Sequence, residues 1–178
     1  KLINLDSEDE NIYIGCAGGF DVEVNLETKK KPYFGEVYKI KVDNLPGGHS
    51  GVDIDKNHPN AIKEVTKQLK DNWTLLSIKG GERRNSIPRE CEALVISESK
   101  LKYPKVENKG KVLLNSNELI RFLKAVPNGV LGIDREFDVV SKSLNLAIVT
   151  NEKVILSARA NSKELMDELK MELKALFS

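Results

Sequence analysis

The feature that most constrains the fold of this chain is the order in which strand-like and helix-like segments follow one another. From residue 33 onward, stretches in which apolar and polar residues alternate, the period of a half-buried strand, are separated by single stretches with the spacing of an amphipathic helix. The order is strand, helix, strand, strand, helix, paired strands, helix. Helices that come singly between antiparallel strands predict an α+β fold: a ferredoxin-like open antiparallel sheet with helices on one face. Such folds host many functions, so the fold alone decides none of them.

Individual elements can be assigned to residue ranges. Alternation predicts strands at residues 20–26, 36–42, 73–79, 91–96, 139–149 and 154–160, with a short one at 111–114, and apolar spacing predicts helices after residue 59, after residue 116 and after residue 161. The lysine-rich stretch 97–110 is expected to be an exposed loop. Asn161 with Glu164 resembles a capping box at the start of the last helix.

A charged run at residues 29–32 marks a candidate domain boundary. Before it, two short strands are expected within residues 1–14, and the run Gly-Cys-Ala-Gly-Gly at residues 15–19 is typical of a hinge or a close backbone approach. We therefore expect two parts. Residues 1–31 supply strands at the end of one domain together with a hinge, and residues 32–178 form a second domain.

The charge balance and the cysteines limit the classes of partner. The chain has 28 Lys and Arg residues against 27 Asp and Glu residues, a net charge of +1, so it lacks the basic surface expected of a nucleic-acid or membrane-surface protein. No apolar run approaches the length of a membrane span. Two cysteines far apart in sequence, Cys16 and Cys91, indicate no disulfide framework, and a cytoplasmic location is expected. We expect neither nucleic acid nor membrane as a partner.

The stretch at residues 45–54 is the strongest candidate for chemistry. It reads Leu-Pro-Gly-Gly-His-Ser-Gly-Val-Asp-Ile and lies between a predicted strand and a predicted helix. Its glycines allow a tight path that presents one imidazole, His49, which can donate or accept a proton or polarise a carbonyl. A long loop with a solvated histidine is the alternative. A phosphate-binding loop is a weaker one, because the stretch has neither glycine-rich phosphate-binding pattern.

A complete metal site is not expected in this chain alone. The sequence has two histidines, His49 and His58, and neither H-E-x-x-H nor C-x-x-C spacing. A catalytic zinc site takes about three protein ligands.

Several motifs in order resemble one family. They stand at residues 2–8 (Leu-Ile-Asn-Leu-Asp-Ser-Glu), 15–19, 47–54, 84–90 (Arg-Asn-Ser-Ile-Pro-Arg-Glu), 127–130 (Pro-Asn-Gly-Val) and 143–146 (Ser-Leu-Asn-Leu). Together they resemble the aminoacyl-histidine dipeptidases, cytosolic zinc enzymes among the aminoacylase and carboxypeptidase-like metallopeptidases. The sequence departs from the family pattern at Asp55 and at residues 57–59, and its 97–110 loop is short.

The resemblance implies a domain organisation and an activity. Enzymes of this family have a catalytic domain with two divalent metal ions, zinc, and an inserted ferredoxin-like lid domain that dimerises. This chain is similar to the lid, residues 32–178, with residues 1–31 as strands from the end of the catalytic domain. The implied activity is hydrolysis of Xaa-His and other dipeptides, with the catalytic domain of the same chain and a second subunit as partners. The fragment alone is expected to bind no metal and to be inactive.

The resemblance also assigns four residues, each with a plainer alternative. Asp6 matches a metal ligand, or is an acid at a strand end. His49 matches the lid histidine that stabilises the oxyanion of the tetrahedral intermediate in the active site of the partner subunit. Asn85 matches a polar residue near the substrate, or is a turn residue. Arg159 matches an arginine that holds the dipeptide carboxylate, or is a solvated strand arginine.

A second function class remains open at this point. A ferredoxin-like regulatory or binding module without catalytic activity would have the same pattern of elements. An RNA-binding version would present stacking aromatics and a basic face, whereas this chain is 6% aromatic and nearly neutral. A module that binds a small molecule is compatible with the sequence. Substitutions in the glycine loop that spare all enzyme activity would favour it.

Overall fold

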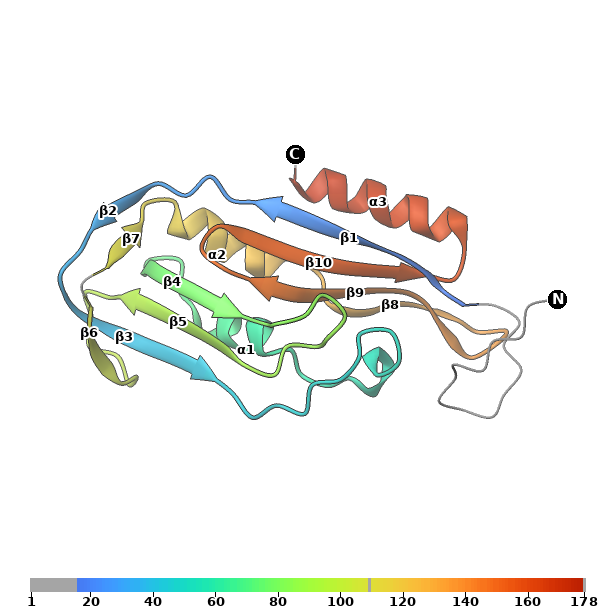
Figure 1. Cartoon of the computed structure of the whole chain (residues 1–178), viewed down its shortest axis with the longest axis horizontal. Helices are drawn as coiled ribbons and strands as arrows, with labels where there is room; N and C mark the ends of the chain where they lie inside the picture. Colours follow the sequence, from blue (N-terminus) through green and yellow to red (C-terminus); the bar gives the residue numbers. More distant parts are fainter. Residues whose placement is uncertain (1–15, 109, 178) are drawn as a thin grey trace.

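One antiparallel sheet of eight strands organises the described residues, 16–108 and 110–177, of this computed structural model (Figure 1). The strand order is β1-β10-β9-β4-β5-β3-β6, and β8 pairs with β9 beside this path. Every pairing in it is antiparallel. The strands are β1 (Gly18–Asn25), β3 (Gly35–Val42), β4 (Thr74–Gly80), β5 (Cys91–Ile96), β6 (Lys105–Asn108), β8 (Gly129–Asp134), β9 (Val139–Val149) and β10 (Lys153–Ala160).

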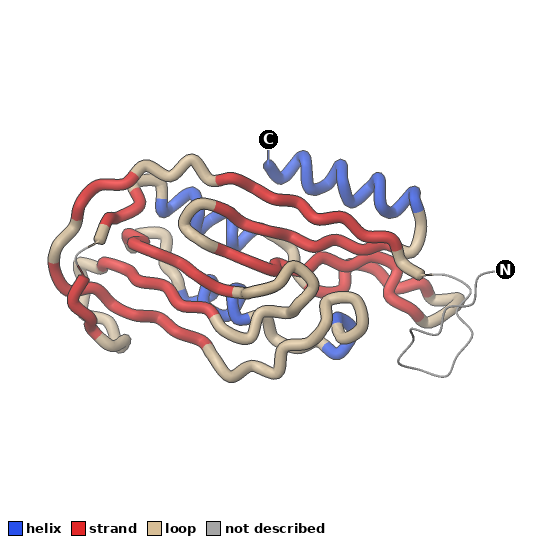
Figure 2. Tube along the Cα trace, in the orientation of Figure 1, coloured by secondary structure: helices blue, strands red, loops and turns tan. Residues whose placement is uncertain are grey.

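The helices pack against one face of this sheet, as the alternation predicts. They are α1 (Ala61–Gln68), α2 (Ser116–Ala125) and α3 (Lys163–Phe177). Figure 2 shows α1 and α2 behind the strands and α3 alongside the β1 edge. One apolar cluster joins all three helices to the sheet, and its fully buried members include Ile62, Ile120 and Leu156. The α+β fold with an open antiparallel sheet is therefore confirmed.

Several details differ from the sequence-based expectations. Strand β1 begins at Gly18, within the run expected to be a hinge, and a short strand, Lys30–Pro32, lies in the charged run. The 97–110 stretch is not wholly irregular, because β6 pairs with β3 at the sheet edge. Strand β8 was not expected, since its apolar residues follow no strict alternation, and it pairs with β9 through two register shifts. The hydroxyl of Ser162, not Asn161, caps α3 by accepting from the amide of Leu165 (3.2 Å). The side-chain amide of Asn161 instead donates to the Asp134 carboxylate (3.4 Å).

Residues before position 32 contribute strands to the described structure. Strand β1 pairs with β10 along its whole length, and β2 (Lys30–Pro32) forms a separate two-stranded sheet with β7 (Lys111–Leu113). The division into residues 1–31 and 32–178 stays a prediction, although β1 is paired within the sheet of the second part. The short strands expected within residues 1–14, and Asp6, lie outside the described residues.

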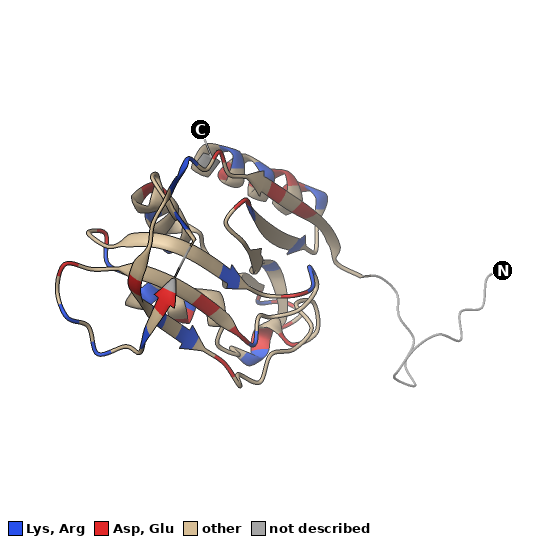
Figure 3. Cartoon of the chain, turned by 60° about the vertical axis from the view of Figure 1, so that its left-hand side comes forward, with Lys and Arg blue, Asp and Glu red and all other residues tan. Residues whose placement is uncertain are grey.

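The surface carries charge of both signs. Figure 3 shows acidic and basic residues interspersed over the strands and along α3. No helix in the described part of the chain is long and apolar enough to cross a membrane.

Candidate functional site

Two connections run side by side at one end of the sheet. The connection from β3 to α1, residues 43–60, is bonded to the connection from β4 to β5, residues 81–90. Two backbone hydrogen bonds of 2.8 Å join them, from the Ser50 amide to the Asn85 carbonyl and from the Ile87 amide to the Gly48 carbonyl. Because each connection supports the other, their side chains share one site.

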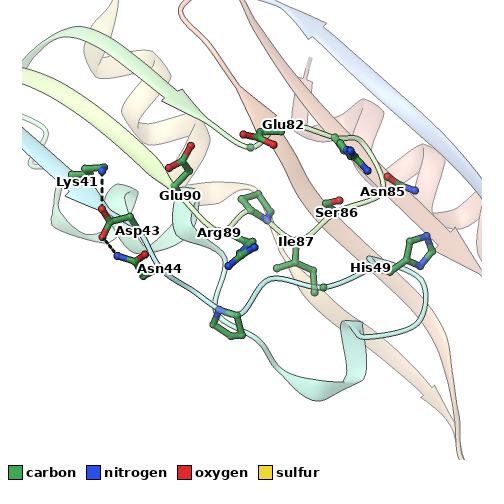
Figure 4. A pocket seen from close by; sticks show the side chains of 15 residues that line it. Lys41, Asp43, Asn44, His49, Glu82, Asn85, Ser86, Ile87, Arg89 and Glu90 are labelled. Atoms are coloured by element: carbon green, nitrogen blue, oxygen red, sulfur yellow. Dashed lines mark hydrogen bonds and ion pairs between the residues drawn. The ribbon is translucent and has the colours of Figure 1, made fainter.

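These connections line a cavity of about 720 Å³. His49 and Asn85, two of the residues singled out in the sequence, lie at the same end of it (Figure 4). The cavity walls carry both signs of charge, with Lys41, Asp43, Glu82, Arg83, Arg89 and Glu90 among the lining residues.

The sharp turn before His49 depends on glycine at position 48. Gly48 has φ +141°, a conformation that residues with a side chain rarely adopt. A Cβ built there would stand 2.8 Å from the Cβ of Asp53. The glycine therefore lets the Asp53 side chain close onto the backbone of the loop.

Asp53 holds the backbone of His49 in place. Its Oδ2 accepts from the His49 amide (2.7 Å) and its Oδ1 accepts from the ammonium of Lys56 (2.6 Å). The pKa of the Asp53 carboxyl lies below its ordinary value. The main cause is the hydrogen bond from Lys56, and the second is the hydrogen bond from the His49 amide. Asp53 was not singled out in the sequence, although an aspartate in a glycine-rich turn is a residue that commonly accepts nearby backbone amides.

The imidazole of His49 has one nitrogen committed and one available. Its Nδ1 accepts from the Gly51 amide (3.2 Å), and the neutral ring then carries its hydrogen on Nε2. No hydrogen bond to Nε2 forms within residues 16–108 and 110–177. The side chain is exposed at the cavity. His49 is thus arranged to present an N–H donor outward.

Arg159 lies behind the same loop. It is a half-buried residue of β10, and a Cβ built on Gly51 would stand 2.9 Å from its Cζ. Its Nε is buried and has no hydrogen-bond partner in the described part of the chain, and the same holds for the hydroxyl of Ser50. Arg159 is not among the residues that line the cavity. The structure therefore brings His49 and Asn85 together and places Arg159 next to their loop.

An adjacent arginine ties the second connection to the edge of the sheet. Arg84 pairs with Asp21 (3.4 Å) and Glu23 (3.0 Å) of β1. These exposed pairs fix the direction of the chain just before Asn85 more than they add to stability.

No three His, Cys, Asp or Glu side chains of the described residues lie close enough together to hold a metal ion. The described residues do not fit a complete metal centre. Asp6, the residue that the resemblance assigns as a ligand, lies outside them.

Comparison with known proteins gives consistent matches. Residues 40–117 match the model of a peptidase dimerisation domain. The chain is 34% identical over 188 residues to the cytosol non-specific dipeptidase of Escherichia coli (strain K12), an alignment that covers 84% of this chain and 39% of that protein. The resemblance to dipeptidases drawn from the motifs is confirmed.

A solved structure has the same fold. The crystal structure of aminoacylhistidine dipeptidase from Vibrio alginolyticus superposes with a TM-score of 0.77 at 24% identity, over 92% of this chain and 42% of that one. The chain thus spans about two fifths of the length of each of these relatives.

Proposed function

We propose that this chain is the lid and dimerisation part of a metal-dependent dipeptidase, and that His49 stabilises the oxyanion of the tetrahedral intermediate. The observation that carries the proposal is the arrangement of His49. Its neutral ring has Nε2–H free, at a cavity shared with Asn85, within a region that matches a peptidase dimerisation domain. An oxyanion requires a preorganised N–H donor, and this tautomer supplies one.

The other site residues take roles that suit a dipeptide. A dipeptide carries an ammonium and a carboxylate, and the cavity walls carry both signs of charge. Asn85 contacts the substrate from the cavity wall. Arg159, whose guanidinium lies against Gly51 of the loop that carries His49, holds the C-terminal carboxylate. The substrate class is Xaa-His and other dipeptides.

The metal ions belong to the complete enzyme. Two divalent ions, zinc, are assigned to its catalytic domain, with Asp6 as one ligand. When bound, such ions polarise the scissile carbonyl and activate water. In this organisation residues 1–31 lead out of the catalytic domain, residues 32–178 form the lid, and the enzyme is a homodimer. It is cytoplasmic, a location that the name of the Escherichia coli relative states for that protein.

The first experiment measures turnover of an aminoacyl-histidine dipeptide by the complete, zinc-loaded protein. We expect His49→Ala to lower kcat by about 100- to 1,000-fold, because one preorganised oxyanion donor is lost. Asp55→Ala is the matched control, since Asp55 is exposed on the same loop, and it should leave kcat unchanged. Unchanged turnover of His49→Ala contradicts the role of His49. A metal-loaded protein that hydrolyses no dipeptide contradicts the proposed function and favours a binding module.

A mixing experiment tests whether His49 acts in the partner subunit. Subunits with His49→Ala are combined with subunits that carry Asp6→Ala. In a mixed dimer, one site then has an intact metal centre together with the intact His49 of the other subunit. If half the dimers are mixed and each has one such site, activity returns to about a quarter of the unmodified level. If His49 serves its own subunit, no activity returns.

A further inference from the structure

Strand β9 has a gap in its pairing next to the site. On one side it pairs with β8 over residues 139–144 and meets β4 only at the pair Gly80 and Val149. Between these points two asparagine side chains replace a neighbouring strand for Leu146. The Leu146 amide donates to Asn128 Oδ1 (2.8 Å), and the Leu146 carbonyl accepts from Asn60 Nδ2 (2.9 Å). Buried backbone groups need such partners.

The first turn of α1 determines which way the Asn60 amide points. Asn60 is the N-cap of α1, and its Oδ1 accepts from the amides of Ile62 (3.0 Å) and Lys63 (3.3 Å). Its Nδ2 must therefore face the opposite way. There it meets two further acceptors, Asn128 Oδ1 (3.0 Å) and Asn145 Oδ1 (3.4 Å).

The orientation of Asn145 follows from that of Asn60. Because the oxygen of Asn145 accepts from Asn60, its Nδ2 points away from it, and it donates to the carbonyl of Ser86 (2.8 Å). Asn145 is 1% exposed. A buried side chain with both ends bonded has one arrangement, since an unmade bond there is costly. The orientation of a helix cap is thus passed on to a carbonyl of the site.

We propose that Asn145 is a positioning residue for the dipeptide site, acting through Ser86. Ser86 follows Asn85 in the chain and forms an isolated bridge with His49. Asn145 thereby holds Ser86 against the sheet. Ser86 lies where the proposed substrate-binding residue Asn85 and the proposed oxyanion donor His49 meet. The inference rests on the proposed function, because it assumes that these two residues act on substrate.

Asn151 offers a matched control. It lies in the turn between β9 and β10, and its Oδ1 accepts from the amide of Ile78 in β4 (2.8 Å). Both asparagines bond from the β9–β10 hairpin to backbone of the β4–β5 hairpin. They do so at different places, because Ile78 lies within β4 whereas Ser86 belongs to the site. Asn145→Ala and Asn151→Ala thus remove similar bonds with different consequences.

Amide exchange in the complete protein tests the anchor without reference to activity. In Asn145→Ala, the amides of Ser50 and Ile87, which join the two connections, should exchange about tenfold faster. In the unmodified protein, local opening must also break the hydrogen bond from Asn145 to the Ser86 carbonyl, and in the variant this bond is absent. In Asn151→Ala their exchange should not change. Equal exchange in both variants would show that Asn145 does not anchor the site.

Kinetics of the complete enzyme test the consequence. We expect Asn145→Ala to lower kcat about tenfold and to raise KM several-fold, since the reacting groups lose alignment. A merely structural role lowers the folded fraction and leaves KM unchanged. Asn151→Ala should alter neither constant. An unchanged KM in Asn145→Ala overturns the positioning role. If the unmodified enzyme has no dipeptidase activity, the proposed function is overturned, and the amide exchange alone then tests whether Asn145 anchors Ser86.

Discussion

Gly51 lies directly against the guanidinium of Arg159: a Cβ at position 51 would stand 2.9 Å from the Arg159 Cζ and 3.0 Å from its Nε. The loop that carries His49 and the strand that carries Arg159 approach this closely because residue 51 has no side chain. The position of the Arg159 guanidinium, proposed to bind the substrate carboxylate, therefore depends on a glycine in the loop that carries His49.

This contact gives a prediction for Gly51→Ala. The added methyl group displaces the end of a flexible side chain, so the free energy of unfolding should fall by no more than about 1 kcal/mol. Substrate binding should weaken, with KM of the complete dipeptidase rising about tenfold, because the guanidinium is moved from the carboxylate it holds. A double-mutant cycle provides the check. In an Arg159→Ala background, Gly51→Ala should raise KM no further, and an additive effect would contradict the explanation.

The Asp53 carboxylate predicts how stability depends on pH. Its pKa in the folded chain lies below the ordinary value of 3.8, chiefly because of the hydrogen bond from Lys56. A carboxyl with a lowered folded pKa stabilises the folded state above its unfolded pKa, and this contribution disappears as the pH falls through the folded pKa. Denaturant unfolding of the chain and of Asp53→Ala should therefore show a constant difference between pH 5 and 7 that shrinks below about pH 4. A difference that does not shrink as the pH falls below 4 would argue against ionisation as its source.

The two cysteines should differ in reactivity. Cys91 is 1% exposed on β5, and burial raises the pKa of its thiol to about 12, whereas Cys16 is exposed. Since the thiolate is the reactive form, a thiol reagent at pH 8 should label Cys16 in the native chain and Cys91 only after unfolding. Mass spectrometry of the labelled peptides reports the sites. Native labelling of Cys91 at the rate of Cys16 would show that β5 opens locally.

Alternation and apolar spacing were enough to assign the type and order of most elements. Alternation places the side chains of a strand on two faces, so the apolar sets of 36–42, 91–96 and 154–160 predicted strands that the structure contains as β3, β5 and β10. Strand β10 is buried on both faces, because the sheet is covered there. Strand β8 was not predicted, because its apolar residues do not alternate strictly, and its pairing with β9 contains two register shifts. Local patterns report local structure, and they fail where pairing across the sheet sets the conformation.

The sequence also singled out His49, Asn85 and Arg159, through a glycine-rich loop and through motif resemblance. How these residues lie relative to one another depends on the folded structure. His49 and Asn85 share a cavity, Arg159 lies behind Gly51, and Asn145 anchors Ser86 from a strand far along the chain. These relationships join residues widely separated in sequence. Their geometry comes from backbone pairing and from the fixed orientation of buried amides, and neither leaves a periodic trace in a single sequence.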